Sequence, residues 1–320
     1  MSARAAQNRN LGRARAAQND EFYTQLADIE RELAHYAHHF RGRTVFCNCD
    51  DPRVSKFFDY FSRNFEFLKL RKLVTTCYQN PRADIFSRHD SEKAVRLEYN
   101  GDLNNNRMPD PDEIGVQDLR EDGDFRSEEC VELLRKADIV VTNPPFSLFR
   151  EFVAQLVAHK KKFLVIGNHN ALTYKEIFKL IKANKVWLGY SPRGMEFLRP
   201  DGSLNSVNAC WFTNLDHAKR HEDLVLYEEY SPKAYLKYDN YDAINVDKTA
   251  KIPADYAGVM GVPISFLDKY NPDQFKIIGL AAGNIRGLAG IPTTSGTDGP
   301  YINGKLKYGR IFIRNKRVQK

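Results

Sequence analysis

The stretch from residue 20 to residue 215 limits the fold most, because it alternates short apolar runs with helical patterns. Apolar residues recur at steps of three and four between Phe22 and Tyr36, which predicts a helix over 20–40. Runs that suit buried strands lie at 43–48, 72–78, 94–99, 138–141, 162–167, 185–189 and 208–215. Further helices are predicted from Asp51, after Ser127, and over 147–159 and 173–184. This alternation predicts an α/β fold, a parallel sheet with helices on both faces.

The strand predicted at 138–141 ends in a turn that carries two consecutive prolines, Asn-Pro-Pro-Phe. Active sites in parallel α/β sheets lie at the carboxyl ends of the strands, where this turn is expected. Pro144 and Pro145 have fixed φ angles and no N–H, so the turn is stiff and its carbonyls point outward. Asn143 adds a side-chain acceptor, and Phe146 offers a ring for stacking. Two acceptors and a ring suit the exocyclic amine of a base; the alternative is an ordinary loop stiffened by prolines.

Beyond Leu215 the alternation stops, so we expect a basic arm at 1–19, a catalytic domain at 20–215 and a separate region at 216–320. Both ends are basic. Residues 1–19 contain no acid and four arginines: Arg4, Arg9, Arg13 and Arg15. The tail from 303 also lacks acids and includes Lys316 and Arg317. With a net charge of +7, such ends fit phosphate contacts, and they fit solvated termini equally well.

Several other classes of protein do not fit this chain. It has no apolar run of 18 residues and no apolar segment typical of a secretory signal, so we expect neither a membrane span nor secretion. Five cysteines are too few for a disulfide scaffold and indicate a reducing cytoplasm. Cys47 and Cys49 have no second pair at zinc spacing, so we interpret them as strand residues and expect no metal.

The Asn-Pro-Pro-Phe turn resembles motif IV of S-adenosylmethionine-dependent amino-methyltransferases. The wider chain resembles the EcoRI-type adenine-specific DNA methyltransferases. The matching stretches are "DEFYTQ" (20–25), "CNCDDPRVS" (47–55), "GDF" (123–125), "DIVVTNPPFSLFRE" (138–151), "KYDNYDAINV" (237–246) and "GVMGVPI" (258–264). Because they extend from residue 20 to the last quarter, the resemblance covers almost the whole chain. It implies a Rossmann-like methyltransferase sheet followed by a C-terminal recognition region.

The resemblance also implies where S-adenosylmethionine would bind. The expected cofactor residues are Phe22, Tyr23, Thr24, Asn48, Asp50, Asp51, Tyr78, Asp124 and Phe125. Two positions depart from the wider methyltransferase pattern. Cys49 and its neighbours replace a glycine-rich turn after the first strand, and Cys77 with Tyr78 stand where an acid commonly holds the ribose. Asp124 is expected to accept from the adenine amine of the cofactor, and Phe125 to pack on that ring.

By the same resemblance, the substrate is an adenine flipped out of double-stranded DNA. Asn143 and Pro144 would accept from its N6 amine and Phe146 would stack on the base, with neither metal nor covalent nucleophile. Target recognition is expected at 216–320, with the basic ends and with Lys237, Tyr238 and Asn240 as DNA contacts. GAATTC, methylated at the second adenine, is the first sequence to test, and the family suggests a monomer.

Two other functions stay open at this point. Asn-Pro-Pro-aromatic turns also serve methyltransferases that act on RNA bases or on glutamine side chains, because each substrate presents an amine or amide nitrogen. A non-catalytic DNA-binding protein on the same scaffold is the second alternative. Methylation assays with DNA, RNA and protein would separate the first group, and cofactor binding would decide on the second.

Overall fold

A computed structural model describes residues 23–318 except 50–54, 79–93, 105, 107–108, 110–112, 194, 199–203, 207 and 283–285. The described residues form two compact units. The first contains the residues up to His169 together with Ser191–Leu215. The second contains Asn170–Tyr190 and the residues from Asp216 onward. The segment 170–190 therefore belongs to the second unit, whereas the predicted catalytic domain at 20–215 includes it.

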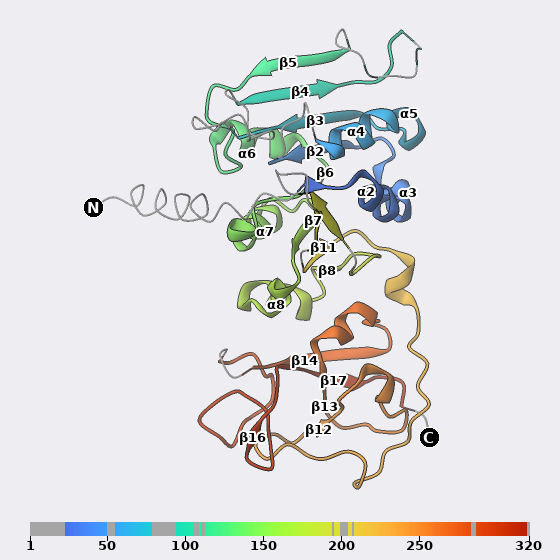
Figure 1. The fold of residues 1–320 in the computed structure, drawn as a ribbon, viewed down its shortest axis with the longest axis vertical. Helices are drawn as coiled ribbons and strands as arrows, with labels where there is room; N and C mark the ends of the chain where they lie inside the picture. The colour runs from blue at the N-terminus through green and yellow to red at the C-terminus, as the bar shows by residue number, and fades with distance from the viewer. Residues whose placement is uncertain are drawn as a thin grey trace, which may run out of the picture. The chain divides into compact units, whose positions relative to one another are not determined.

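The first unit contributes seven strands to an eight-stranded sheet, in the order β5-β4-β3-β2-β6-β7-β11 (Figure 1). Their bounds are β2 Thr44–Asn48, β3 Lys72–Thr76, β4 Val95–Tyr99, β5 Ile114–Asp118, β6 Ile139–Thr142, β7 Lys162–Asn168 and β11 Ala209–Thr213. Three further strands form a small sheet in the order β1-β9-β10: β1 Tyr23–Thr24, β9 Glu196–Leu198 and β10 Leu204–Ser206.

The four central strands, β3, β2, β6 and β7, run parallel. The outer strands do not: β4 is antiparallel to β3, β5 to β4 and β11 to β7. The prediction of an α/β fold is thus confirmed, but the prediction of a wholly parallel sheet is wrong. Parallel neighbours need a crossover, usually a helix, and the predicted loop at 100–113 joins β4 to β5 without one. Strand β5 itself was not predicted.

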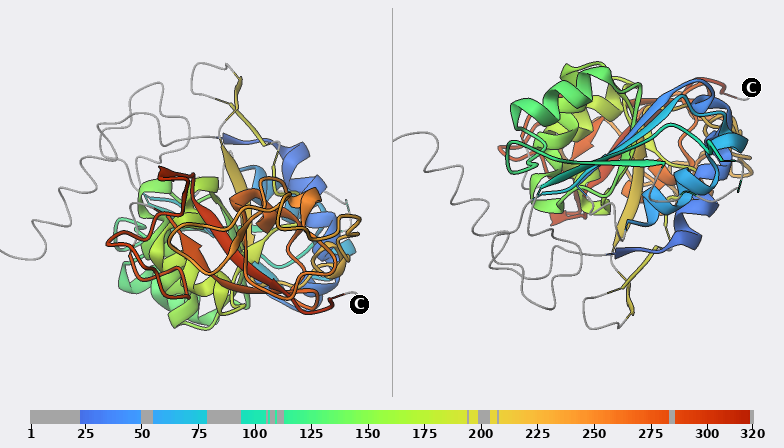
Figure 2. Two further views of the ribbon diagram at one scale, coloured as in Figure 1. Left: turned by 90° about the horizontal axis from the view of Figure 1, so that it is seen from below. Right: turned by 90° about the horizontal axis from the view of Figure 1, so that it is seen from above.

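Helices cover both faces of the sheet, as predicted. Their bounds are α2 Leu26–Leu33, η1 Ala34–Tyr36, α3 Ala37–Phe40, α4 Lys56–Arg63, α5 Phe65–Leu68, α6 Glu128–Lys136, η2 Phe146–Leu148 and α7 Phe149–Ala158. Helices α2 and α4 lie on one face, and α6 and α7 lie on the other (Figures 1 and 2). Between the two layers, Phe46, Val140 and Phe163 have no exposed surface, so the parallel strands form the centre of the core.

Two helices begin later than predicted. The apolar stripe of α2 is buried at Ile29, Leu33 and Tyr36, as expected, but Tyr23 and Thr24 form strand β1 instead of the first helical turn. Helix α4 begins at Lys56, where the Oγ of Ser55 accepts from the backbone N–H groups of the next turn. By contrast, Ser127 caps α6 as predicted, by accepting from the N–H of Cys130.

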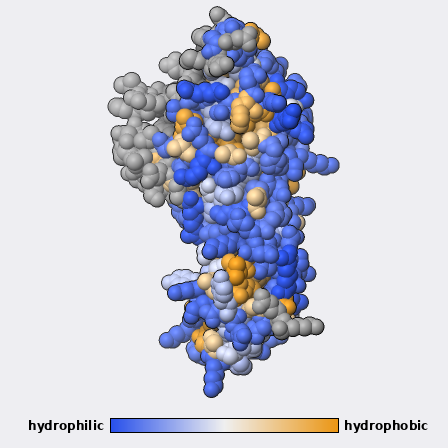
Figure 3. All heavy atoms as spheres, turned by 90° about the vertical axis from the view of Figure 1, so that its right-hand side faces the viewer, coloured by the Kyte–Doolittle hydropathy of each residue, from blue (hydrophilic) through white to orange (hydrophobic). Residues whose placement is uncertain are grey.

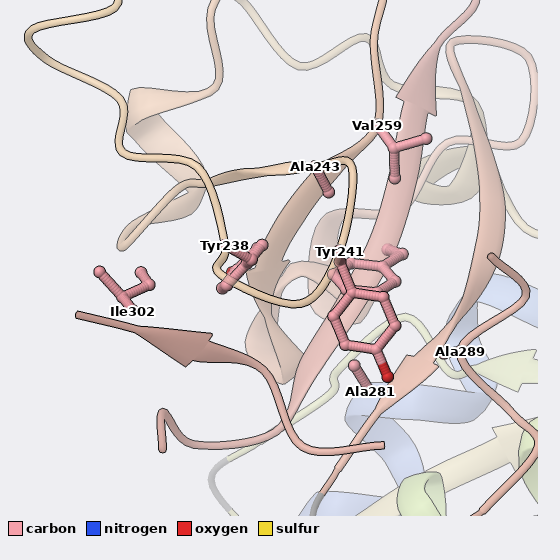
Figure 4. Close-up of a cluster of buried hydrophobic side chains, with 8 residues drawn as sticks. Tyr238, Tyr241, Ala243, Val259, Ala281, Ala289 and Ile302 are labelled. Atoms are coloured by element: carbon pink, nitrogen blue, oxygen red, sulfur yellow. The ribbon is translucent and has the colours of Figure 1, made fainter. Parts of the chain in front are cut away.

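The second unit is built around a four-stranded sheet in the order β12-β13-β17-β14. Its regular elements are α8 Lys175–Lys182, β8 Trp187–Leu188, η4 Ala218–His221, β12 Ile244–Asn245, η5 Thr249–Lys251, β13 Met260–Pro263, η6 Ile264–Lys269, β14 Phe275–Ala281, β15 Tyr301–Ile302, β16 Lys305–Leu306 and β17 Arg310–Asn315; η3 His169–Thr173 precedes α8. On one face of this sheet Tyr238, Tyr241 and Phe312 pack with small apolar residues (Figure 4).

The molecular surface shown in Figure 3 is mostly hydrophilic, and its apolar side chains gather in small, separate groups. Among the helices of the described residues, none is long and apolar enough to cross a bilayer.

Candidate functional site

The carboxyl ends of β2 and β6 meet at the point where the strand order reverses. Strand β3 continues the sheet on one side of β2, and β6 and β7 continue it on the other. Ligands of open α/β sheets bind in the crevice at such a switch point. The register pairs Phe46 with Val140, and the Oγ1 of Thr142 donates a hydrogen bond to the carbonyl of Asn48. The two exits therefore begin side by side.

The Asn-Pro-Pro-Phe turn starts at the residue after Thr142. Pro144 is buried, whereas Asn143, Pro145 and Phe146 are half-buried, so the turn offers part of its surface for contact. Pro145 has φ −55° and ψ 125° and precedes η2, whose Leu148 N–H donates to the Pro145 carbonyl at 3.0 Å. The predicted catalytic residues are thus held in a short turn between a buried strand and a helix.

Phe149, the first residue of α7, anchors the far side of this turn. It is 1% exposed and its ring lies 4.9 Å from the ring of Phe212. Gly167 in β7 makes room for that ring, since a Cβ on Gly167 would lie 2.4 Å from the nearest Phe149 atom. The position of the turn therefore depends on a close contact between α7 and β7, which no sequence pattern had indicated.

At the exit of β2, Asn48 is 2% exposed and its Oδ1 is buried with no hydrogen-bond partner among the described residues. A buried acceptor in this state needs a donor, because leaving it unpaired costs about 1–3 kcal/mol. Cys49 follows with a φ of 76°, a left-handed conformation that favours glycine. Cys49 is therefore not a strand residue, and its prediction as one is wrong, whereas Cys47 does lie in β2. Asp50 and Asp51 lie outside the described residues.

The exit of β3 is joined to the turn at 122–125. Gly123 has a φ of 74°, and a Cβ there would lie 2.0 Å from the carbonyl oxygen of Cys77. Only glycine permits this approach. The close approach of Gly123 to Cys77 brings Asp124 and Phe125, both predicted to bind the cofactor, next to the segment that contains the half-buried Tyr78.

Asp124 and Phe125 have partners within the protein. Both carboxylate oxygens of Asp124 accept from the guanidinium of Arg126, at 2.8 and 2.6 Å, and Arg126 also lies 3.3 Å from Glu151. The hydrogen bond with Asp124 raises the pKa of Arg126. Phe125 is 5% exposed and packs edge-on against Phe152. Arg126 was not predicted as a site residue, but it fixes the orientation of Asp124. Its position two residues after Asp124 is the sequence feature that could have indicated this contact.

The third cofactor segment is strand β1, where Thr24 pairs with Phe197 of β9. The Oγ1 of Thr24 is buried and has no hydrogen-bond partner in the described part of the chain. It is thus a second polar atom that a ligand could satisfy. Phe22 lies outside the described residues, and of Tyr23 only the backbone is described.

The residues predicted to contact DNA differ in their exposure to solvent. Lys237 is exposed, 3.6 Å from Asp242, whereas Tyr238 and Asn240 are each 4% exposed and bond within the second unit. Lys316 and Arg317 are exposed; Lys316 donates to the carbonyl of Pro272 and Arg317 pairs with Asp223. Arg4, Arg9, Arg13 and Arg15 lie outside the described residues. Tyr238 and Asn240 are therefore interior residues, and their burial does not favour the predicted role as DNA contacts.

No group of three or more possible metal ligands exists among the described histidines, cysteines and acids. The site therefore consists of backbone turns, amide and hydroxyl oxygens, and aromatic rings at the carboxyl edge of the sheet. This donor set suits a neutral or cationic organic ligand with N–H groups.

Comparison with known proteins agrees with this geometry. The family described as "Adenine-specific methyltransferase EcoRI" matches residues 10–316. The chain is 47% identical to Type II methyltransferase M.EcoRI of Escherichia coli, over 99% of this chain and 100% of that protein. It is 36% identical to M.MpnI of Mycoplasma pneumoniae (96% and 98% covered) and 35% to M.MgeORF184P of Mycoplasma genitalium (97% and 99%). No solved structure matches. The chain belongs to the EcoRI family of adenine-specific methyltransferases.

Proposed function

We propose that this protein transfers a methyl group from S-adenosylmethionine to N6 of an adenine flipped out of double-stranded DNA. One observation carries the proposal: the Asn-Pro-Pro-Phe turn begins beside the exit of β2 at the switch point of the sheet. A base held by the turn and a methyl donor held at the β2 exit would therefore be neighbours. Holding the two reactants together supplies most of the catalysis in such a transfer.

The residues at the strand exits fit S-adenosylmethionine. The buried Oδ1 of Asn48 and Oγ1 of Thr24 both lack partners among the described residues and can accept from amino or hydroxyl groups. The Gly123 turn presents Asp124 at the β3 exit, where its remaining lone pairs can accept from an adenine amine. Bound there, the cofactor supplies an electrophilic methyl group on a positively charged sulfur.

The turn at 143–146 would hold the target base. The Oδ1 of Asn143 and the carbonyl oxygen of Pro144 accept from the two N–H groups of N6, which keeps the nitrogen lone pair available for the incoming methyl. Phe146, half-buried beside them, stacks on the purine ring and replaces the stacking lost on flipping. Pro145 fixes the spacing between the acceptors and the ring.

For the remaining regions we propose a basic arm at 1–19, catalysis by 20–215 and target recognition by 216–320, with the protein acting as a monomer. The structure groups 170–190 with the second unit, so this segment would serve recognition by supporting it. GAATTC is the first target to test. The family membership favours adenine in DNA over RNA bases or glutamine.

The test is the Asn143→Ala variant, assayed for methyl transfer to duplex DNA and for cofactor binding by calorimetry. We expect turnover to fall by about 10²-fold or more, as when one preorganised polar contact is removed from a catalytic site, with cofactor affinity kept within about threefold. Asn104→Ala, in an exposed loop, is the matched control. Equal losses of turnover and cofactor affinity, or wild-type protein that leaves every adenine unmodified, would refute the proposal.

A further inference from the structure

A tight β-hairpin stands outside the four-stranded sheet of the second unit. Strands β15 and β16 pair Tyr301 with Leu306 and Ile302 with Lys305, which leaves a two-residue loop. The loop residues, Asn303 and Gly304, have φ values of 51° and 71°. Positive φ at both positions defines a type I′ turn, the connection that matches the twist of paired strands. In Figure 1, β16 lies toward the left-hand margin of this unit.

The two faces of the hairpin differ. Ile302 is 5% exposed and packs into the aromatic cluster of the unit, so its face points inward (Figure 4). Side chains alternate along a strand, which places Leu306 and then Tyr308 on the opposite, outward face. Leu306 is 53% exposed and Tyr308 is 89% exposed, the highest value among the large apolar residues described. A two-stranded ribbon thus presents a leucine and a tyrosine to solvent.

Positive charge flanks this apolar pair. Lys305 and Lys307 flank Leu306 in the sequence, so by the same alternation their side chains leave from the other face of the ribbon; Lys305 is exposed and Lys307 half-buried, and no ion pair of either is found in the described part of the chain. Two nearby acids accept hydrogen bonds from backbone N–H groups. Asp239 accepts from Asn303 and Gly304, and Asp298 accepts from Gly287. The hairpin therefore combines two lysines with an exposed leucine and an exposed tyrosine.

Asp239 and Asn240 fix the position of the hairpin through hydrogen bonds. Asp239 binds the hairpin turn at 3.1 and 2.8 Å. The Nδ2 of Asn240 donates to Thr293, Ser295 and the carbonyl of Gly299, and its Oδ1 accepts from the N–H of Tyr301 at 3.0 Å. One pair of neighbouring side chains thus fixes both the hairpin and the polar loop that leads into it.

We propose that the hairpin 301–308 is a DNA-contacting element, and that Asp239 and Asn240 are its positioning residues. Lys305 and Lys307 would meet phosphates, while Leu306 and Tyr308 pack against base edges in a groove. The major groove admits a two-stranded ribbon, and apolar side chains that enter a groove contribute to bending and recognition. This inference rests on the proposed function for the identity of the partner, duplex DNA.

The first test measures binding of a fluorescent GAATTC duplex at several salt concentrations, with the full-length protein. Each lost phosphate contact lowers the slope of log K against log salt by about 0.9, so Lys305→Ala/Lys307→Ala should lower it by about 1.8. The control is Lys248→Ala/Lys251→Ala, which removes the same charge from exposed positions of the same unit. A slope unchanged in the first variant, or lowered equally in both, would overturn the proposal.

Tyr308 has a matched control in Tyr227, which is 84% exposed. Tyr308→Ala should weaken duplex binding about tenfold, since burying a large apolar side chain contributes about 1.5–3 kcal/mol. Tyr227→Ala should leave binding within about twofold of wild type. Because both side chains are exposed, neither variant should lower the unfolding temperature. Equal affinities of the two variants would contradict a contact at Tyr308.

The positioning role of Asp239 is tested by two substitutions with opposite consequences. Removing an acid should strengthen DNA binding if only charge matters. Asp239→Ala also frees the hairpin turn, so we expect weaker binding, whereas Asp239→Asn keeps an acceptor oxygen and should bind at least as well as wild type. Tighter binding by Asp239→Ala would overturn the positioning role. If wild-type protein methylates adenine but all hairpin variants bind as wild type, only this inference fails.

Discussion

Gly123 is the residue whose replacement should most clearly connect folding with cofactor binding. Its φ of 74° is unfavourable for any side chain, and a new Cβ would lie 2.0 Å from the carbonyl oxygen of Cys77. Real Cβ contacts stay beyond 3.0 Å, so the turn or the β3 exit must move by at least about 1 Å. Gly123→Ala therefore displaces the segment that carries Asp124 and Phe125.

The expected loss of stability has two parts. A left-handed conformation costs an alanine about 1–2 kcal/mol, of which about 0.4–1 kcal/mol is offset by the smaller entropy of the unfolded chain. The contact with Cys77 adds about 1–3 kcal/mol, typical of overpacking. Gly42 isolates the first part, because it has a φ of 69° and a Cβ there would meet nothing within 4 Å. Gly123→Ala should thus exceed Gly42→Ala by about 1–3 kcal/mol.

The assay compares thermal unfolding and calorimetric cofactor binding for the two variants. We expect Gly123→Ala to lose at least about tenfold in affinity for S-adenosylmethionine, or about 1.4 kcal/mol, and Gly42→Ala to keep wild-type affinity. Both glycines lie in the first unit, so the same unfolding transition reports on them. If the two variants lose equal stability and both bind the cofactor normally, the turn does not depend on its contact with Cys77.

Three further predictions concern other residues of the two units. Cys49→Gly should change the unfolding free energy by less than about 1 kcal/mol, whereas Cys49→Val should lower it, because the φ of 76° tolerates glycine and strains a β-branched residue. A higher urea midpoint for Cys49→Val than for Cys49→Gly would contradict this. Gly167→Ala should destabilise by about 1–3 kcal/mol and reduce methylation by moving Phe149, and adding Phe149→Leu should recover part of the unfolding temperature; no recovery would argue against the contact. The hydrogen bond with Asp216 raises the pKa of His221, so the protonated ring contributes stability below its unfolded value of 6.5, and that contribution is lost as pH rises through the folded pKa. The stability difference between wild type and His221→Gln, below about 1 kcal/mol at this exposed site, should therefore be larger near about pH 5 than near about pH 8, and a difference that grows toward alkaline pH would contradict the assignment.

Local patterns were sufficient to predict much of the first unit. The stripe through Ile29 and Leu33, the cap at Ser127 and the Asn-Pro-Pro-Phe turn at a strand exit all depend on residues close in sequence, and the structure shows each of them. Strand β5 was missed because four of its five residues are exposed, so an edge strand of this kind lacks the alternation that identifies a half-buried one.

Predictions that depended on long-range contacts were weaker. Nothing near Gly123 in the sequence indicates that the carbonyl of Cys77 fills the space of its missing side chain. Similarly, the polar residues of 237–246 suggested a DNA-reading surface, but Asn240 turns inward and bonds to residues 53 or more positions away. A polar side chain that supports a neighbouring loop has the same local sequence signal as one that faces a ligand.

The hydrogen bond between Thr142 and the carbonyl of Asn48 connects the two halves of the proposed site. If each ligand orders the exit at which it is proposed to bind, binding at one exit lowers the entropy that the other exit must still lose. By thermodynamic reciprocity, the proposed S-adenosylmethionine and target base would then raise one another's affinity by the same factor. The buried hydroxyl of Thr142 would in this way give the protein its highest affinity for DNA when S-adenosylmethionine is already bound.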